Sequence, residues 1–506
     1  MSHAHADEHD QIEPHESGAL AIRRFAMHGM IWGGAILCVA LSAYSVELAA
    51  ISRMNGWWLD ELFSLTATDP RQGFGSAFVN WIATETNPPL YYSGLYAVRT
   101  LIADDRTATL VLNASALIAA AAAIAVSSRR AGMPRFGMIG IAAILLSGPV
   151  LRYSVEARAY LLAIEIVFVA SWFCGLTVQG SRSSTVTSFS IIGALGALTH
   201  VYAALMCGSL AAGTIMVAVL YKRHDLCVRG LALGVATVVV LAIWLPFGFQ
   251  NAHNLNWIKF NVHSVVSTAA AALIGGGGVT LERTALLAFA IALCGGLYSR
   301  ITRAMAIMFS IALMLFVFIP IAVSFKLPII VERYWVIGSP VAIVFSLLAC
   351  WTWLSEGISS QRRMPTWIPA CAAAVFVVIG DVTGFAAAKA SVAHKMVWSG
   401  APIVAEYAIK CPPGSVHVLR SLLWLYAKSA GVPKDVFVDA NSLKTPIVTV
   451  AEARCRVLGW AEHDVEIMMH PDISDQALLH SLKIDASASD VEVLRHLSGF
   501  VVLRRN

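Results

Sequence analysis

The sequence contains few charged residues. Only 13% of its 506 residues are Asp, Glu, Lys or Arg, whereas a soluble globular protein averages about 25%. Hydrophobic residues make up 58% of the chain. This composition excludes an ordinary soluble protein and predicts a polytopic membrane protein. The net charge of +5 is small, so it gives no reason to expect a nucleic acid as partner.

The sequence also lacks the cysteine spacings of redox and zinc sites. It has nine cysteines but no CxxC pair and no zinc-binding pattern. Cys227 lies in a basic loop and is predicted to be a free thiol. Cys411 and Cys455 lie in the polar C-terminal region, and they are the one plausible disulfide if that region is outside the cytoplasm. The others lie in apolar segments as small buried residues: Cys38, Cys174, Cys207, Cys294, Cys350 and Cys371.

No convincing signal-peptide cleavage site follows the first apolar segment. Residues 1–24 are polar and rich in histidine, which predicts a disordered cytoplasmic tail, with a metal-binding tract as the alternative. Arg23 and Arg24 then precede an apolar run to about residue 51. That run is too long for the core of a signal peptide, so we expect it to remain as the first membrane span.

About eleven segments approach the roughly 20 apolar residues that a membrane span needs. They lie near residues 25–51, 108–128, 136–151, 159–179, 187–199, 201–221, 230–250, 283–298, 304–325, 335–355 and 366–388. The fifth is short and ends at Thr199-His200, as a half-span or broken helix would. Basic residues gather in alternate loops, which assigns those loops and the N-terminus to the cytoplasm. Residues 52–107 and everything after about 388 then lie outside.

The outer loop at 52–107 is expected to be partly helical. Phe74, Phe78, Trp81 and Ile82 have the spacing of an amphipathic helix, which we expect at the membrane interface. A shorter helix is expected near residues 59–63, and the segment at 90–102, which begins with a pair of tyrosines, is expected to dip into the membrane. Another outer loop contains four consecutive glycines at 275–278, which indicate a hinge. A phosphate cradle is the weaker interpretation, because no Gly-Lys-Ser/Thr sequence follows.

Residues 389–506 change in composition and predict a soluble periplasmic α/β domain without a recognisable catalytic motif. Strands are expected near 416–419, 436–438, 447–450, 455–458 and 500–503, and helices near 402–409, 421–430 and 475–482. The expected fold class is therefore mainly α. It combines a transmembrane helical bundle at 25–388, of about eleven spans, with this C-terminal domain.

Carboxylates, cationic side chains and polar aromatic residues gather in the outer segments. Arginine and lysine can bind a phosphate, and a carboxylate can take a proton from an attacking hydroxyl. Acids at a bilayer edge are costly and tend to be functional. We therefore predict a site for an amphiphile with a phosphate head group. The candidates are Asp60, Glu61, Glu85, Asn87, Tyr91, Glu156, Arg158, His200, Lys326, Arg333 and Tyr334.

Two of these acids are also candidate metal ligands. A divalent cation, Mg²⁺ or Mn²⁺, could bridge the substrate phosphate to Asp60 and Glu85 and help the leaving group depart. The sequence supplies no other cofactor signal.

The sequence resembles the GT-C superfamily of integral-membrane glycosyltransferases, which includes protein O-mannosyltransferases and aminoarabinose transferases. The ordered motifs span most of the first 340 residues. They are Trp58-Leu59-Asp60-Glu61, Glu85-x-Asn-Pro-Pro-Leu-Tyr-Tyr, Tyr-Ser-x-Glu-Ala-Arg-x-Tyr at 153–160, Thr199-His200 and Glu332-Arg333-Tyr334.

The resemblance implies inverting transfer of a sugar from a polyprenyl-phosphate carrier to a lipid, glycan or protein acceptor, at the periplasmic face of the bacterial inner membrane. By the same resemblance, Asp60 matches the catalytic acid, Glu85 the second acidic position, and Arg333 a cation near the carrier phosphate. Asn87 departs from the family pattern, which often has Lys or Asp there.

Several candidates also have a structural interpretation. Glu61 can be the acid at a helix start, Glu156 and Arg158 can form an ion pair within a turn, and His200 can bond to the backbone. Asp60 and Glu85 can be solvated loop acids, Arg333 a membrane-edge anchor, and Trp57 and Trp58 part of an aromatic belt.

Two other functions remain open from the sequence. One is a lipid or polysaccharide flippase or transporter, which would need ionisable residues deep within its spans. Glu47 and Glu165 are the exceptions to the outer clustering, and both lie near predicted span ends or interfaces. The other is a ligase that moves a polysaccharide en bloc.

Overall fold

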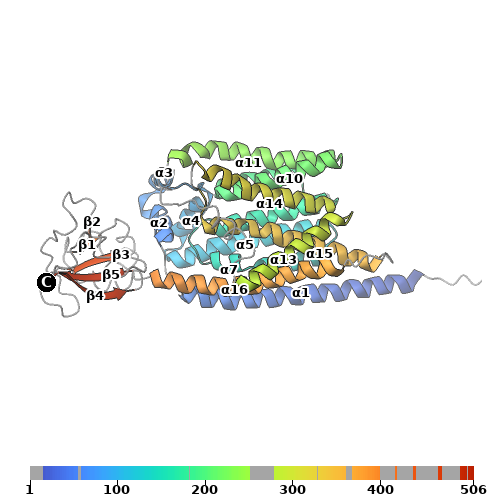
Figure 1. The fold of residues 1–506 in the computed structure, drawn as a ribbon, viewed down its shortest axis with the longest axis horizontal. Coiled ribbons are helices and arrows are strands. Elements are labelled where there is room, and N and C mark those ends of the chain that lie inside the picture. The colour runs from blue at the N-terminus through green and yellow to red at the C-terminus, as the bar shows by residue number, and fades with distance from the viewer. Residues whose placement is uncertain are drawn as a thin grey trace, which may run out of the picture.

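The protein is a bundle of long helices. The computed structural model describes residues 15–54, 59–181, 183–250, 279–326, 329–359 and 367–398, and five strands in the C-terminal region. Figure 1 shows the long helices side by side, with α1 and α16 along one edge of the bundle and α11 along the opposite edge. The short helices α2, α3 and α4 lie together at one end.

The helices follow one another along the chain with short connections. They are α1 (His15–Met54), α2 (Leu59–Ala67), η1 (Pro70–Gln72), α3 (Phe74–Thr84), α4 (Leu90–Leu101), α5 (Asp105–Arg130), α6 (Pro134–Leu146), α7 (Gly148–Tyr153), α8 (Tyr160–Val178), α9 (Val186–Thr199), α10 (Val201–Leu220), α11 (His224–Gln250), α13 (Val279–Tyr298), α14 (Arg303–Ser324), η3 (Glu332–Gly338), α15 (Ser339–Ser359) and α16 (Trp367–Trp398).

Within the described residues, seven helices are long and apolar enough to cross a membrane. These segments are Gly33–Ser52, Asp105–Arg130, Tyr160–Val178, Val201–Leu220, His224–Gly248, Arg303–Ser324 and Arg333–Ser355. Four shorter apolar helices, at Pro134–Leu146, Val186–Thr199, Arg283–Tyr298 and Ile368–Gly380, occupy the other four positions where spans are expected. The positions of the apolar helices therefore agree with the sequence, while the number that crosses the bilayer stays a prediction.

One segment that was expected to form a single span forms two helices instead. Residues 136–151 were expected to be continuous, but α6 ends at Leu146, and Ser147 is extended with φ −65° and ψ 123°. Pro149 lies in the first turn of α7, where its missing N–H costs nothing, whereas inside a continuous helix it would break the hydrogen-bond ladder. The break places the turn after Tyr153 inside the bundle, and this turn carries two of the candidate site residues.

Helices at the two ends of the bundle domain are longer than the sequence predicts. α1 begins at His15, so the predicted tail is helical from that residue onward. Extending an existing helix needs no new nucleus, which explains why the segment continues the first span. α16 runs to Trp398 and passes the domain boundary expected at 388. Residues 1–14 lie outside the described part of the chain.

The described strands form one mixed sheet in the order β2-β1-β3-β5-β4. β1 (Val416–Val418) pairs in parallel with β2 (Phe437–Asp439) and β3 (Val465–Met469), whereas β5 (Phe500–Arg505) is antiparallel to β3 and β4 (Val491–Leu497). Three strands fall at expected positions, and β3 and β4 were not expected. The expected strands at 447–450 and 455–458, and the expected helices of this region, lie outside the described residues, so the α/β domain stays a prediction.

The centre of the bundle is α8, whose residues are almost all buried. Trp172 on α8 stacks on Phe136 of α6 at 4.9 Å and donates a hydrogen bond of 3.1 Å to Ser128 of α5. Its ring also leaves no room for a Cβ at Gly140. Small residues let membrane helices approach closely, so glycine here sets how tightly α6 packs against α8.

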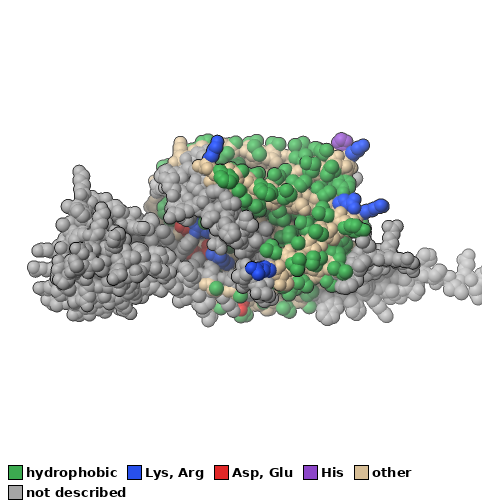
Figure 2. All heavy atoms as spheres, in the orientation of Figure 1, with side chains coloured by type: hydrophobic (Ala, Val, Ile, Leu, Met, Phe, Trp, Pro, Cys, Tyr) green, Lys and Arg blue, Asp and Glu red, His purple; other side chains and the backbone are tan. Residues whose placement is uncertain are grey.

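Contacts near helix ends identify one end of the bundle. Gln179, after α8, donates 2.8 Å to Thr352 near the end of α15, and Arg223, before α11, donates 2.8 Å to the carbonyl of Val178. Figure 2 shows a largely hydrophobic side of the bundle, with basic side chains projecting at the end away from α2 and α3. The sequence places its arginine-rich loops at this same end, which supports the alternation that the charge pattern predicts.

The packing of α10 against α14 can be tested with two glycines of one helix. A Cβ at Gly213 would collide with the backbone carbonyl of Met308, whereas a Cβ at Gly208 would meet nothing within 4 Å. Because a backbone cannot yield as a side chain can, we expect Gly213→Ala to destabilise the protein by about 1–3 kcal/mol. Gly208→Ala should be neutral or stabilising by up to about 1 kcal/mol. Thermal unfolding in detergent checks both, and equal midpoints would contradict the close approach.

Candidate active site

A buried arginine joins the separate outer segments. Arg158 lies in the turn between α7 and α8, and its side chain is only 8% exposed. Its Nη1 donates to Glu85 Oε1 at 2.9 Å, to the Tyr92 hydroxyl at 3.1 Å and to Ser64 Oγ at 3.2 Å. These partners come from α2, from the segment after α3 and from α4. The guanidinium therefore holds three parts of the outer loop against the start of α8.

Asp60 is the acid of this cluster that can meet a ligand. It lies in the first turn of α2, and its Oδ2 is 2.7 Å from Nη2 of Arg333 and 4.0 Å from Nη2 of Arg158. Its side chain is 26% exposed, compared with 6% for Glu85. Figure 2 shows charged side chains of both signs in a recess at the end of the bundle where α2 lies. The accessible carboxylate is thus held between two cations.

Glu61 lies in a different environment from its neighbour Asp60. It is fully buried, and its Oε1 accepts the backbone N–H of Ala157 at 3.0 Å. Both acids of the pair lie in the first turn of α2, where acids favour the helix dipole. Burial and the bond to a distant backbone show that Glu61 fixes the turn before α8 rather than facing an open site.

The turn at 154–159 is held by further groups, of which Tyr91 and Glu156 were predicted site residues and Asn113 was not. Asn113 on α5 donates to the carbonyls of Ser154 and Glu156 at 3.0 and 3.1 Å. The Tyr91 hydroxyl also donates to the Glu156 carbonyl, at 3.2 Å. The Glu156 carboxylate forms a 3.8 Å ion pair with Arg152. A polar residue inside an apolar span, such as Asn113, is the one signal that could have identified this contact.

Aromatic rings form the wall beside Arg333. The rings of Tyr160, His200 and Tyr334 have mutual centroid distances of 5.2–6.1 Å, and Tyr202 packs on Tyr334 at 4.9 Å. The Arg333 guanidinium carbon is 5.9 Å from the ring centroids of Tyr160 and Tyr334. These distances allow cation–π attraction, which helps to position the guanidinium against Asp60.

His200 is a neutral donor in this wall. Its Nδ1 accepts the backbone N–H of Tyr202 at 3.1 Å and caps α10, so the proton is assigned to Nε2. Burial, assisted by the positive charges of Arg158 and Arg333, lowers the pKa of His200 to about 3. Among the described residues, neither Nε2 nor the buried Tyr160 hydroxyl has a hydrogen-bond partner. Two unsatisfied polar groups therefore border the site.

The remaining predicted residues do not all join the cluster. Asn87 is buried in the segment that links α3 and α4. Lys326 lies exposed after the end of α14, and the described part of the chain contains no ion pair to it. Trp57, Trp58, Gly275–Gly278, Cys411 and Cys455 lie outside the described residues, so the aromatic belt, the hinge and the disulfide stay predictions.

The described residues contain no group of three or more His, Cys, Asp or Glu side chains that could hold a metal ion. Asp60 and Glu85 instead both lie against the Arg158 guanidinium. They do not form a ready cation site, and a metal bound by these two acids together with a substrate phosphate stays a prediction.

Comparison with known proteins supports the fold. No family model matches the sequence, and no curated protein matches it. Solved structures do match. ArnT from Cupriavidus metallidurans bound to undecaprenyl phosphate superposes with a TM-score of 0.51 at 13% identity, covering 94% of this chain and 98% of that one.

The protein has the fold of ArnT. The apo state of the same transferase gives a TM-score of 0.51 at 14% identity, with coverage of 94% of this chain and 97% of that one. The resemblance to integral-membrane glycosyltransferases therefore rests on fold over nearly the whole chain, in addition to the five motifs. The ArnT fold brings the first two motifs and Arg158 of the third together, with Arg333 of the last.

The protonation of His200 predicts how stability depends on pH. Its pKa is about 3 when folded, against about 6.5 for a histidine in an unfolded chain. The unfolded chain therefore binds the extra proton between these values, and stability falls by roughly 1.4 kcal/mol per pH unit as pH drops through this window. We expect His200→Gln to flatten this fall. The exposed His224 provides the control, and thermal unfolding midpoints from pH 7 to 4 measure both. Equal slopes for His200→Gln and wild type would contradict the assignment.

Proposed function

We propose that the protein is a glycosyltransferase of the bacterial inner membrane that uses a polyprenyl-phosphate-linked sugar. The observation that supports this most is the meeting of Asp60, Glu85, Arg158 and Arg333 at one end of an ArnT fold. One of the matching ArnT structures is described as bound to undecaprenyl phosphate. A lipid phosphate is a dianion or monoanion at the bilayer edge, and arginine is the residue best suited to bind it there.

Arg333 is the proposed phosphate ligand. Arg158 is committed to Glu85, Tyr92 and Ser64, so it serves mainly to hold the site together. Arg333 is more exposed, at 15% of its side chain, and its ion pair is with the accessible Asp60. A phosphate arriving from the bilayer would compete with Asp60 for this guanidinium, because both are anions that bind the same N–H groups.

Asp60 is the proposed general base. When the phosphate takes over Arg333, the Asp60 carboxylate is released from its 2.7 Å ion pair and is free to accept a proton. An acceptor hydroxyl then attacks the anomeric carbon of the sugar and gives its proton to Asp60. The bond between that carbon and the phosphate oxygen breaks, and its electron pair leaves with the polyprenyl phosphate. Direct attack from the face opposite the phosphate inverts the anomeric carbon.

The residues of the aromatic wall beside Arg333 have roles that are compatible with sugar transfer. The His200 Nε2–H and the Tyr160 hydroxyl are buried donors without partners in the described structure, and they could bind oxygens of the phosphate or the sugar. Glu85 keeps Arg158 in place through its 2.9 Å bond and would act as a positioning acid. Metal assistance by Asp60 and Glu85 is tested by chelation, since a metal-dependent transfer would stop in EDTA.

The proposed orientation follows from the charge pattern. The arginine-rich loops lie at the end of the bundle away from α2, so the charged site faces the periplasm if those loops are cytoplasmic. The 389–506 region would then be periplasmic as well. A periplasmic site is also where a lipid-linked sugar would meet envelope acceptors, such as a lipid, a glycan or a secreted protein.

A flippase or transporter is the second candidate. The observation that favours it is Glu165, a buried acid within α8, because transporters place ionisable residues within their spans. Reconstituted protein that moves intact lipid-linked sugar across vesicles, with no glycosidic product, would support it. A product that gains many sugars at once would instead indicate en bloc ligation.

Replacing Asp60 tests the base directly. We expect Asp60→Asn to fold normally but to lower sugar transfer at least about 10²-fold, the usual worth of a general base. Release of polyprenyl phosphate from a labelled lipid-linked sugar in membranes measures the rate. Asp225→Asn is a matched control, because Asp225 also lies between two arginines, Arg223 at 3.0 Å and Arg229 at 3.2 Å. Wild-type transfer by Asp60→Asn would show that the base lies elsewhere.

Replacing Arg333 separates phosphate binding from chemistry. We expect Arg333→Gln to raise the KM for the lipid-linked donor by about tenfold or more, because a charge-assisted bond to the phosphate is worth about 1.5–3 kcal/mol. Arg333→Lys should recover part of the loss. Arg71 of the same outer loop is 79% exposed and pairs only locally with Asp69, so Arg71→Gln serves as the control. An unchanged donor KM in Arg333→Gln would rule out this cation as the phosphate ligand.

A further inference from the structure

Two hydroxyl groups along α2 are each held by an arginine. Ser64 Oγ donates to the carbonyl of Asp60 at 2.9 Å and accepts a hydrogen bond from Nη1 of Arg158 at 3.2 Å. Thr68, directly after α2, repeats this pattern one turn later. Its Oγ1 donates to the carbonyl of Ser64 at 2.8 Å and accepts from Nη1 of Arg99 at 2.8 Å. Because residues four apart share a helix face, one face of α2 is a chain of hydrogen bonds with an arginine at each end.

Arg99 is the arginine of this pair that lies away from Asp60. It is in the last turn of α4, and its side chain is 9% exposed. Its Nη1 also donates to the carbonyl of Leu65, and its Nε and Nη2 contact Oδ1 of Asp105 at 2.8 and 2.6 Å. A cation at the last carbonyls of a helix is favourable. Since α5 begins at Asp105, Arg99 connects the C-terminal end of α2 to a long apolar helix of the bundle.

The other hydrogen bonds at this end of α2 come from its neighbours in the loop at 52–107. Trp81 of α3 donates to the carbonyl of Ala67 at 2.7 Å. Gln72 of η1 donates to the carbonyl of Thr66 at 2.8 Å. These two bonds hold the short helices to one another, whereas the contact of Arg99 with Asp105 reaches α5.

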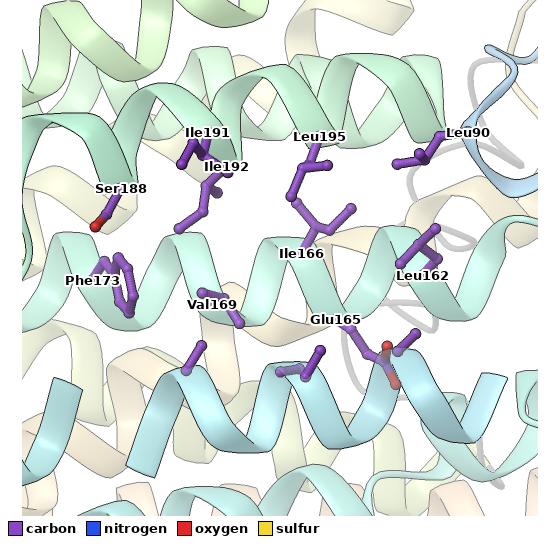
Figure 3. A pocket seen from close by; sticks show the side chains of 14 residues that line it. Leu90, Leu162, Glu165, Ile166, Val169, Phe173, Ser188, Ile191, Ile192 and Leu195 are labelled. Atoms are coloured by element: carbon purple, nitrogen blue, oxygen red, sulfur yellow. The ribbon is translucent and has the colours of Figure 1, made fainter. Parts of the chain in front are cut away.

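The helices that receive the two anchors of α2 are not packed tightly along their whole length. A cavity of about 340 Å³ lies between α5, α8 and α9, with Leu90 of α4 at one end (Figure 3). The side chains that line a void lose packing contacts with the opposite wall. A connection from α5 through α2 to the start of α8, at the end of the bundle that carries α2, therefore helps to fix one helix relative to the other.

α2 is too short to hold its own position. It has nine residues, whereas isolated helices shorter than about 12–15 residues are marginal in water. Its first turn is fixed where Glu61 accepts the N–H of Ala157 at 3.0 Å. A helix held at one end can still tilt, and a second anchor about 12 Å along the axis from Asp60, at Thr68, fixes its direction.

We propose that Arg99 is a positioning residue for Asp60. By holding Leu65 and Thr68 against Asp105, it sets the direction of α2 and thereby the place of the carboxylate in its first turn. This inference rests on the proposed function, in which Asp60 is the general base. A base must lie within hydrogen-bond reach of the proton that it takes, and a misplacement of about 1 Å can lower a rate about 10²-fold.

Sugar-transfer kinetics test the position of the base. We expect Arg99→Gln to lower kcat about 10- to 100-fold and to leave the donor KM within about twofold, because Arg99 does not touch the proposed phosphate ligand. Thr68→Val should also lower kcat, whereas Thr68→Ser, which keeps the hydroxyl, should retain it. Arg106→Gln is the matched control, since Arg106 donates instead to the Ser52 carbonyl of α1 at 3.1 Å. Its kcat should equal that of wild type.

A double variant separates positioning from a general loss of folded protein. Asp60→Asn with Arg99→Gln should transfer no more slowly than Asp60→Asn alone, because no base remains to be positioned. A merely structural role would lower the residual rate further, by the same factor that Arg99→Gln costs in wild type, and that result would overturn the proposal.

Hydrogen exchange tests the anchor without reference to activity. Amides of residues 59–69 should exchange about fivefold faster in Arg99→Gln than in wild type, and at the wild-type rate in Arg106→Gln. Unchanged exchange in Arg99→Gln would overturn the anchor, and faster exchange with a wild-type kcat would overturn the positioning role. If wild type itself transfers no sugar, the proposed function fails, while the exchange result still decides whether Arg99 anchors α2.

Discussion

The end of the bundle that carries α2, α3 and α4 depends on one buried guanidinium. Arg158 could not be buried without partners, because an isolated charge in a low-dielectric interior is very costly. Its partners are supplied by α2, α4 and the segment after α3. These segments also contact one another, since Trp81 donates a hydrogen bond to the carbonyl of Ala67 and Arg99 donates one to Thr68. Satisfying the buried cation adds the polar contacts that hold Glu85 and Tyr92, and Asp60 lies within 4.0 Å of the same group. The proposed chemistry follows from that placement.

The helices provide the rigidity that this arrangement needs. Arg158 comes two residues before α8, the most deeply buried helix, and the break at Ser147–Pro149 directs the preceding turn into the bundle. Asn113, Tyr91 and Glu61 each bond to the backbone of that turn. A site assembled from short helices is thus fixed on the deeply buried helix α8, while the Asp60–Arg333 pair is its more exposed part.

Much of this organisation could be predicted from the sequence, because hydropathy and arginine distribution depend on the bilayer rather than on detailed packing. The positions of the apolar helices, the short α9 and the helix at Phe74–Thr84 follow from local patterns. Loop alternation also placed Asp60, Glu85, Arg158 and Arg333 on one side.

The long-range partners could not be predicted: Ser64 and Tyr92 are ordinary polar residues, and nothing local indicates that Glu61 bonds to a backbone 96 positions away. Pro149 is the signal in the sequence that could have identified the break in the third apolar segment.

The most direct measurement compares the lipids and glycans of cells that lack the protein, cells that produce wild type and cells that produce Asp60→Asn. Mass spectrometry of membrane and envelope extracts reports each species by mass. A sugar transferase predicts a product that carries one additional sugar residue in wild-type cells and is absent from the other two. Identical profiles in all three strains, or the same product in cells with Asp60→Asn as with wild type, would contradict the proposal that this charged cluster catalyses sugar transfer.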